Sequence, residues 1–236
     1  MTRRRWIADE FTHDRGLLKG AHAAHLARTL RARVGQEFEI ACGAEVRLGT
    51  ITRVTEKQVE FSLGAVLPST ETIPITLLLA IFKFDRMEWA IEKCAELNVT
   101  QILPVIARRT EKHLAAASAK RVDRWRRIAR EASEQSRRTS PPQIADPLKL
   151  AEALDFDAQF RIVLAETERE AQLSEILRSH TEIHSLALAI GPEGGWTQEE
   201  LQDFTNAQWI AASLGNTILR AETAAIAAMA IARAEI

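Results

Sequence analysis

The stretch Ile75-Thr76-Leu77-Leu78-Leu79-Ala80-Ile81-Phe82 is apolar at every position except one. Apolar residues in an unbroken run, without alternation, are typical of a strand that is covered on both of its faces. Apolar positions at helical spacing follow it, among them Trp89, Ile91 and Cys94. A buried strand that leads into an amphipathic helix predicts an α/β domain with a mainly parallel sheet.

The alternation of strands and helices continues to the carboxyl end of the sequence. Further strands are expected at residues 101–106, 160–165, 185–191 and 208–214, and further helices at residues 118–138, 147–154, 170–178, 197–204 and 221–234. Capping boxes are predicted at two helix starts, one formed by Asp85 and Glu88 and the other by Thr197 and Glu200. The pattern therefore predicts helices on both faces of the sheet.

Residues 1–70 have a different pattern, in which short β segments are separated by turns. Strands are expected at residues 38–41, 46–54 and 59–63, and one short helix at residues 22–31. Short strands at this spacing predict a small β-barrel. Pro68 and Pro74 bound a segment of linker composition. We therefore place the first domain at residues 1–70 and the second at residues 74–236.

The composition is that of an ordinary globular chain. It has 236 residues, of which 46% are hydrophobic and 27% charged, and this excludes a disordered or fibrous protein. Cys42 and Cys94 are the only cysteines, which indicates a reducing compartment. The uncharged apolar run at residues 72–82 is shorter than the ~18 apolar residues of a membrane span. No signal peptide is recognisable after Met1, so we expect a cytoplasmic protein that does not contact membranes.

The formal net charge of −1 is the sum of two halves of opposite sign. Residues 1–138 carry 25 Lys and Arg against 17 Asp and Glu, whereas residues 139–236 carry 6 against 15. Such asymmetry favours contact with a nucleic acid by one part of the chain. For any single run of charges, a solvated and salt-bridged surface remains the alternative.

Two loops after predicted strands carry the candidate chemistry, because ligands of α/β sheets bind beyond the carboxyl ends of the strands. The first, residues 191–195, has three glycines in five positions and exposes backbone N–H groups. It is neither a dinucleotide fingerprint nor a P-loop, and both a ligand loop and a tight turn remain open. The second contains Arg220 and Glu222 in apolar surroundings, where they either face a polar ligand or form an ion pair with each other.

Five motifs occur in a fixed order along the chain. They are H-x-x-x-x-L-R-x-x-x-G at residues 25–35, K-F-D-R-M at 83–87, E-A-S-E-Q-S-R-R at 131–138, G-P-E-G-G at 191–195 and L-G-N-T-I-L-R-A-E-T-A at 214–224. Together they resemble the 16S ribosomal RNA uracil-N3 methyltransferase family (RsmE-like) of the SPOUT superfamily, nearly from end to end. Asn216 and Thr217 stand where that family has Pro-Arg, Phe84 and Arg137 each stand where it has Gly, and Ala24 stands where His or Asn is common.

The resemblance implies a fold, a cofactor and an assembly. The implied fold is a PUA-like β-barrel followed by a SPOUT-type trefoil-knotted α/β domain, the cofactor is S-adenosylmethionine, and the assembly is a homodimer. By the resemblance, three loops wrap the cofactor, and its expected contacts are Leu164, Ala165, Glu166, Ile190, Gly191, Pro192, Glu193, Gly194, Gly195, Leu214, Gly215, Asn216, Ile218 and Leu219.

The implied activity is methylation of N3 of a specific uridine in 16S rRNA of the small ribosomal subunit. Loss of the N3 proton requires a base or stabilisation of the resulting anion. We assign Arg220 or Arg138 to charge stabilisation, and Glu222 or Glu134 to proton removal or to orienting the arginine. The alternatives are a SPOUT methyltransferase that acts on a different RNA position, and a non-catalytic rRNA-binding assembly factor.

Basic residues supply the expected RNA contacts. These are Arg3, Arg4, Arg5, His25, Arg28, Arg31, Lys83, Arg86 and Arg109, and phosphate contacts of this kind make binding salt-sensitive. Trp6 and Trp125 are candidates for stacking on bases, with core packing as the stronger alternative for Trp125. The six histidines show no metal-ligand spacing, so no metal is expected.

Overall fold

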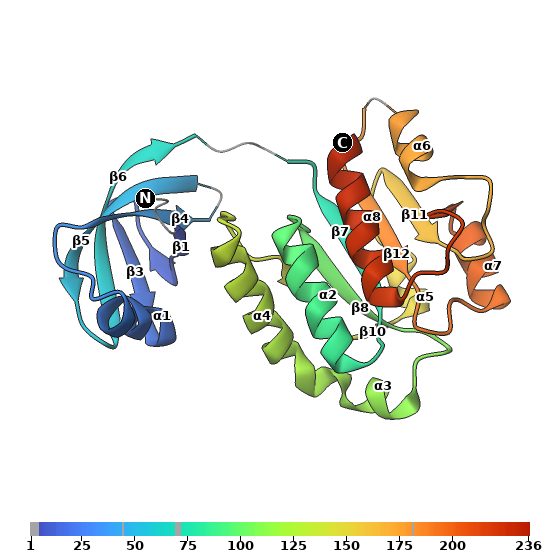
Figure 1. Ribbon diagram of the computed structural model, residues 1–236, viewed down its shortest axis with the longest axis horizontal. Coiled ribbons are helices and arrows are strands. Elements are labelled where there is room, and N and C mark those ends of the chain that lie inside the picture. Colours follow the sequence, from blue (N-terminus) through green and yellow to red (C-terminus); the bar gives the residue numbers. More distant parts are fainter. Residues whose placement is uncertain (1–4, 44, 69–71, 181) are drawn as a thin grey trace. The chain divides into compact units, whose positions relative to one another are not determined.

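The computed structural model describes residues 5–43, 45–68, 72–180 and 182–236. The chain divides into two compact units, the first comprising Met1–Glu71 and Ser133–Pro141, and the second comprising Thr72–Ala132 and Pro142–Ile236. Each unit contains its own sheet and its own hydrophobic core, and Figure 1 labels most of their helices and strands. Residues 133–141 thus group with the amino-terminal part of the chain, although they lie far beyond the expected linker in sequence.

The first unit is built on a mostly antiparallel six-stranded sheet. Its strands are, in spatial order, β1 (Arg5–Ile7), β4 (Glu37–Cys42), β5 (Glu45–Val54), β6 (Gln58–Leu67), β3 (Arg15–Lys19) and β2 (Glu10–Phe11). The helix α1 (Gly20–Ala24) and the π-helical turn η1 (His25–Thr29) follow β3. The three expected strands are confirmed as β4, β5 and β6, whereas β1, β2 and β3 were not expected because each is short and flanked by charges.

The core of the first unit holds Trp6. This side chain is 1% exposed and lies among Leu18, Ile40 and Phe61. The hypothesis that Trp6 stacks on bases is therefore wrong for this structure, because its ring faces are taken by core neighbours. Trp125 is likewise fully buried, in the core of the second unit, as its helical spacing favoured.

The second unit contains a parallel seven-stranded sheet. The spatial order is β10 (Leu148–Lys149), β8 (Gln101–Ile106), β7 (Ile75–Ala80), β12 (Leu186–Ile190), β11 (Phe160–Leu164) and β13 (Ile210–Ala212), with β9 (Gln143–Ile144) also paired to β8. The central strand β7 is buried at every position. Leu77 and Leu79 enter the core on one face, and Leu78 and Ala80 enter the core on the other. The prediction of a strand covered on both faces is confirmed.

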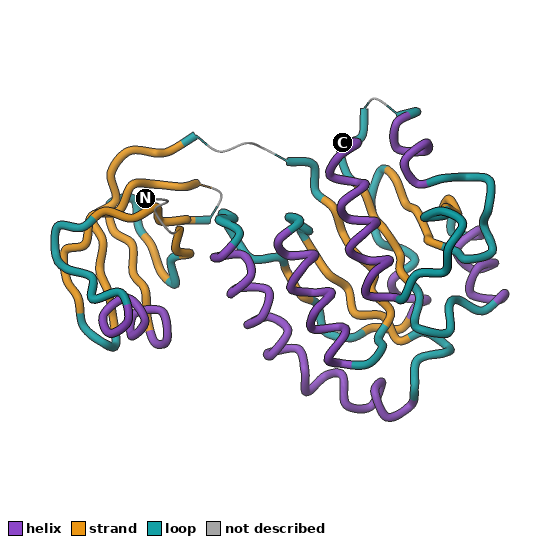
Figure 2. Tube along the Cα trace, in the orientation of Figure 1, coloured by secondary structure: helices purple, strands orange, loops and turns teal. Residues whose placement is uncertain are grey.

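Helices cover both faces of this sheet (Figure 2). One core receives side chains from α2 (Phe84–Glu96), α4 (Val122–Gln135), α6 (Leu173–Arg178) and α8 (Ala221–Glu235), and the other from α5 (Leu150–Ala153) and α7 (Gln198–Asn206). The short helices α3 (Lys112–Ser118) and η2 (Ala119–Arg121) lead into α4. Within the described ranges, none of the helices combines the length and the hydropathy that crossing a bilayer requires.

Helix ends confirm one capping prediction and correct another. At the start of α7, Thr197 Oγ1 accepts from the Glu200 N–H at 3.2 Å and Glu200 Oε2 accepts from the Thr197 N–H at 2.8 Å, so this capping box is present. The prediction of a capping box formed by Asp85 and Glu88 is wrong, because Lys83 is the N-cap residue of α2 and Asp85 lies inside the first turn. Glu88 instead accepts from Arg124 Nε at 2.6 Å.

Candidate active site

A cavity of about 650 Å³ lies at one edge of the second unit's sheet. Its walls come from the loops that follow β11, β12 and β13 and from the first turn of α8. These three strands are parallel neighbours, so their carboxyl ends meet at the same edge, where ligands of α/β sheets bind. The volume lies within the range of small-molecule sites.

The structure brings all fourteen residues of the expected cofactor set to this one cavity. They line it from three segments, which are 164–166, 190–195 and 214–219. The lining also contains residues outside the expected set, among them Thr167, Glu168, Arg169, Trp196, Gln198, Leu201 and Ala224. Glu168 and Arg169 lie shortly after the first expected segment, residues 164–166. Extending that segment further beyond β11 would have included them.

The glycines of the second loop are needed for its shape. Gly195 has a φ of +70°, and its N–H donates to the Pro192 carbonyl at 2.8 Å, which closes a tight turn. A Cβ on Gly191 would lie 3.3 Å from Trp196 Nε1, and one on Gly194 would lie 3.3 Å from Arg109 Cδ. The loop is thus both a tight turn that precedes α7 and a wall of the cavity.

Arg109 holds the backbone of this loop by hydrogen bonds. It follows β8 in the chain, and its Nη1 donates to the Gly194 carbonyl and to the Trp196 carbonyl, the second at 3.3 Å. Sequence reasoning named Arg109 as an RNA contact. In the structure its guanidinium lines the cavity and holds the backbone of the Gly-rich loop.

Glu222 is a buried carboxylate that does not itself line the cavity but adjoins a lining residue in sequence. Its residue is 4% exposed and lies in the first turn of α8, next to the lining residue Ala221. Its Oε1 lies 3.7 Å from Arg86 Nε, and its Oε2 is buried without a hydrogen-bond partner. Arg86 also donates from Nη1 to Glu193 Oε1 at 2.6 Å. Buried polar atoms without partners are costly and rare in folded proteins, so the Glu222 carboxylate is a candidate functional group.

Arg220 occupies a different environment from Glu222. It is exposed and is the N-cap residue of α8, with its carbonyl accepting from the Ala224 N–H at 2.8 Å. The alternative in which Arg220 and Glu222 form an ion pair is wrong, because the cation next to Glu222 is Arg86. The guanidinium of Arg220 is left open to solvent.

Glu134 and Arg138 belong to the first unit. Glu134 is 1% exposed, and its Oε2 lies 3.3 Å from Nε2 of His22 on α1. The Arg138 N–H donates to the Ser133 carbonyl at 2.9 Å. His22 is a further residue that sequence reasoning missed, and no local motif around it distinguishes it from a surface histidine.

The residues of the first unit that were expected to contact RNA differ in their partners and in their exposure. Arg3 and Arg4 lie outside the described residues. Arg5 binds Glu39, Arg28 binds Glu56, and the His25 ring centroid lies 5.9 Å from that of Trp6. Arg31 is exposed at a φ of +49°.

In the second unit, Lys83 is exposed, while Arg86 and Arg109 are engaged as described above. No group of His, Cys, Asp and Glu that suits a metal ion occurs in the part of the chain that the structure describes.

Comparisons with known proteins agree on one family. Residues 69–233 match the model of the RNA methyltransferase domain family. Two similar proteins are ribosomal RNA small subunit methyltransferase E of Rickettsia conorii, 31% identical over 92% of this chain and 88% of its own, and that of Bacillus subtilis, 29% identical over 90% and 87%.

Solved structures show the same likeness. A Legionella pneumophila protein in complex with S-adenosylmethionine aligns with a TM-score of 0.84 at 28% identity, covering 99% of this chain and 98% of its own. Ribosomal RNA small subunit methyltransferase E from Neisseria gonorrhoeae, bound to S-adenosylmethionine, aligns with a TM-score of 0.83 at 28% identity, covering 97% and 95%. The likeness therefore spans both units.

Proposed function

We propose a function from the premise that this chain belongs to the RNA methyltransferase domain family. The protein transfers the methyl group of S-adenosylmethionine to N3 of a uridine in 16S rRNA of the small ribosomal subunit. The names of its relatives and the ligand of the similar structures support this substrate class and cofactor. The observation that carries the proposal is the convergence of three loops, each after a parallel strand, on one cavity.

The cavity fits S-adenosylmethionine in size and in chemistry. Leu164, Ile190 and Leu214 supply apolar wall for an adenine ring, and Glu166 supplies negative charge for a cationic ligand. A Cβ at any glycine of the 191–195 loop would meet a neighbouring protein group or strain the backbone, so glycine is what lets the loop form this wall of the cavity. When bound, S-adenosylmethionine supplies an electrophilic methyl group.

The residues of this chain have two tasks in the proposed reaction, both at the uracil. Glu222 accepts the N3 proton, since its Oε2 has no other hydrogen-bond partner. Arg220, which is exposed at the N-terminus of α8, stabilises negative charge on the uracil carbonyl oxygens. Arg86 orients Glu222 through Oε1. Glu134 and Arg138 offer the same pair of groups from the first unit. Arg138 contacts the RNA that carries the uridine, and Glu134, buried against His22, supports the same segment from inside the unit.

We also propose the finer architecture of the family for this chain. The second unit has the trefoil-knotted SPOUT topology, and the first has the PUA-like barrel fold, with the domains at residues 1–70 and 74–236. A second copy of the chain packs on α8, where Ala225, Ala228 and Met229 are buried within the unit while Ala227 and Ala230 keep exposed surface. Sedimentation of the purified chain tests this homodimer.

Two measurements test the proposed function. Titration calorimetry with S-adenosylmethionine is expected to show stoichiometric binding, and mapping of N3-methyluridine in the rRNA of cells that lack the protein is expected to show one lost modification. Binding with no lost N3-methyluridine would indicate a different RNA position. Absence of binding would indicate a non-catalytic rRNA-binding assembly factor.

A further inference from the structure

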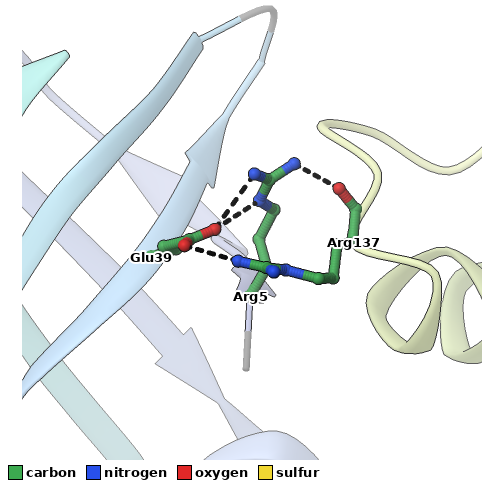
Figure 3. Close-up of polar contacts among 3 residues, drawn as sticks. All are labelled: Arg5, Glu39 and Arg137. Atoms are coloured by element: carbon green, nitrogen blue, oxygen red, sulfur yellow. Dashed lines mark hydrogen bonds and ion pairs between the residues drawn. The ribbon is translucent and has the colours of Figure 1, made fainter. Parts of the chain in front are cut away.

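Arg5, Glu39 and Arg137 form a closed set of contacts in the first unit (Figure 3). Arg5 on β1 and Glu39 on β4 are register partners in the sheet. Arg5 donates from Nε and Nη2 to Glu39 Oε2 at 3.1 and 3.0 Å, and Arg137 donates from Nη2 to Glu39 Oε1 at 2.5 Å. Arg5 Nη1 also donates to the backbone carbonyl of Arg137. The contacts join the sheet to both the side chain and the main chain of Arg137.

The backbone of Arg137 is held in an unusual conformation. Its φ is +62°, a left-handed value that disfavours any residue with a Cβ and favours glycine. Helix α4 ends two residues earlier, at Gln135, and the Arg138 N–H then donates back to the Ser133 carbonyl at 2.9 Å. A non-glycine residue persists in such a conformation where its surroundings fix it. The contacts with Arg5 and Glu39 supply that fixation.

We infer that Arg5, Glu39 and Arg137 are positioning residues for the reaction. They form a clasp that holds residues 133–141 on the sheet and thereby sets the side chains of Glu134 and Arg138. The inference rests on the proposed function, because it gives these two side chains a role at the RNA. Arg138 is bonded directly to Arg137, so any rotation of the Arg137 backbone redirects it.

The side chains of the clasp are shielded from solvent to a degree that suits a structural role. Those of Arg5 and Glu39 are 17% and 16% exposed, and that of Arg137 is 40% exposed. Two guanidinium groups face one carboxylate, which leaves a net positive charge next to Arg138. Charge-assisted arginine contacts to both oxygens of one carboxylate are strong and directional, which is what holding a strained backbone requires.

The test combines hydrogen exchange with kinetics on the full chain. The variants are Arg137→Gln, Glu39→Gln, their double variant and Arg137→Gly, and the matched control is Arg15→Gln, which removes an exposed ion pair with Glu60 on the same sheet. Amide exchange is followed in peptides of residues 133–141 and, as an internal reference, of residues 190–196. Turnover, the KM for an rRNA fragment and the Kd for S-adenosylmethionine are measured separately.

Loss of the clasp is expected to make residues 133–141 more mobile and to lower kcat. Arg137→Gln and Glu39→Gln should each speed exchange at residues 133–141 and lower kcat about tenfold, because small misplacements of reacting groups are costly. The double variant should lose no more than the worse single variant. Arg137→Gly should retain more activity than Arg137→Gln, because glycine adopts the left-handed backbone without help. The control, the reference peptides and the cofactor Kd should stay unchanged.

Two outcomes would overturn the clasp. One is unchanged exchange at residues 133–141 in both single variants. The other is a raised KM with unchanged kcat in Arg137→Gln and Arg137→Gly alike, which would make Arg137 a direct RNA contact. Exchange needs neither RNA nor turnover, so a wild-type protein that methylates no uridine would refute the proposed function while exchange still decides whether the clasp exists.

Discussion

Oε1 of Glu222 lies 3.7 Å from Nε of Arg86, while the other oxygen of the same carboxylate is buried without a hydrogen-bond partner. One side of the group is oriented by a cation and the other is free to accept a proton. Arg86 also holds Glu193 of the Gly-rich loop at 2.6 Å. The arginine therefore connects the proposed base to the wall of the cofactor cavity.

Removing the charge of Glu222 should separate catalysis from cofactor binding. Glu222→Gln keeps the shape but cannot take a proton, and we expect turnover to fall by about 10²-fold or more with the Kd for S-adenosylmethionine unchanged. Calorimetry and single-turnover methylation measure the two quantities. A variant with wild-type turnover would remove Glu222 from the mechanism.

Arg86→Met should affect both turnover and the Kd for S-adenosylmethionine, because it releases Glu193 as well as Glu222. We expect turnover to fall about tenfold and cofactor affinity to weaken by a smaller factor. Arg124→Met is a matched control, since it removes an arginine that binds the exposed face of the same helix at Glu88. Equal effects of the two substitutions would show that only surface charge matters.

Gly195→Ala should weaken cofactor binding through the backbone. An alanine at a φ of +70° is strained by about 1–2 kcal/mol, which corresponds to about tenfold in affinity if the loop relaxes to another shape. Gly20→Ala, at a φ of +55° in the first unit, imposes a similar strain far from the cavity lining in sequence. Calorimetry should show weakened binding for Gly195→Ala alone.

Arg233 should be a strong determinant of stability. From α8 it donates to the carbonyls of Ile73 at 2.7 Å, Leu97 at 3.3 Å and Asn98, and burial lowers the pKa of its guanidinium. Arg233→Met leaves these carbonyls unpaired and should lower the free energy of unfolding by about 2–3 kcal/mol. Arg178→Met, which removes an exposed ion pair with Glu235, should cost less than about 1 kcal/mol. Urea denaturation compares them.

The clasp should also give the protein a pH dependence. Burial alone would raise the pKa of Glu39, but the hydrogen bonds from Arg137 and Arg5 outweigh it and hold that pKa below its ordinary value. The stabilisation is therefore complete above the ordinary carboxyl range and is lost as pH falls through the lowered pKa. The difference in unfolding free energy between wild type and Glu39→Gln should be constant near neutral pH and shrink below about pH 4. A difference that grows on acidification would contradict this sign.

The sequence predicted what local patterns encode. The unbroken apolar run that became β7 and the glycines of residues 191–195 each identify an element by themselves, because burial on two faces and a positive φ leave direct marks on composition. The cofactor set itself followed from the family resemblance, and the parallel pairing of β11 with β12 and β13 is what brings its three segments together.

Pairings between distant positions were beyond the same reasoning. Nothing near Arg86 specifies Glu222 as its neighbour, and nothing near Arg137 specifies Glu39, because such contacts depend on how the chain returns to the same place. The Asp85 box failed for a related reason, since Glu88 is satisfied by Arg124 from another helix. Strand β1, with three residues, is too short to show a period.

Trp196 gives the cavity an optical signal of its own. Its ring lines the cavity and packs against Phe204 with centroids 4.9 Å apart. A ligand that enters the cavity changes the atoms next to this indole, so tryptophan emission should change on binding. Trp6, Trp125 and Trp209 are buried and Trp89 is 48% exposed, but none of these four lines the cavity, so they supply a steady background. Cofactor binding to the unlabelled protein can thus be followed by its tryptophan fluorescence, and Trp196→Phe should abolish the change.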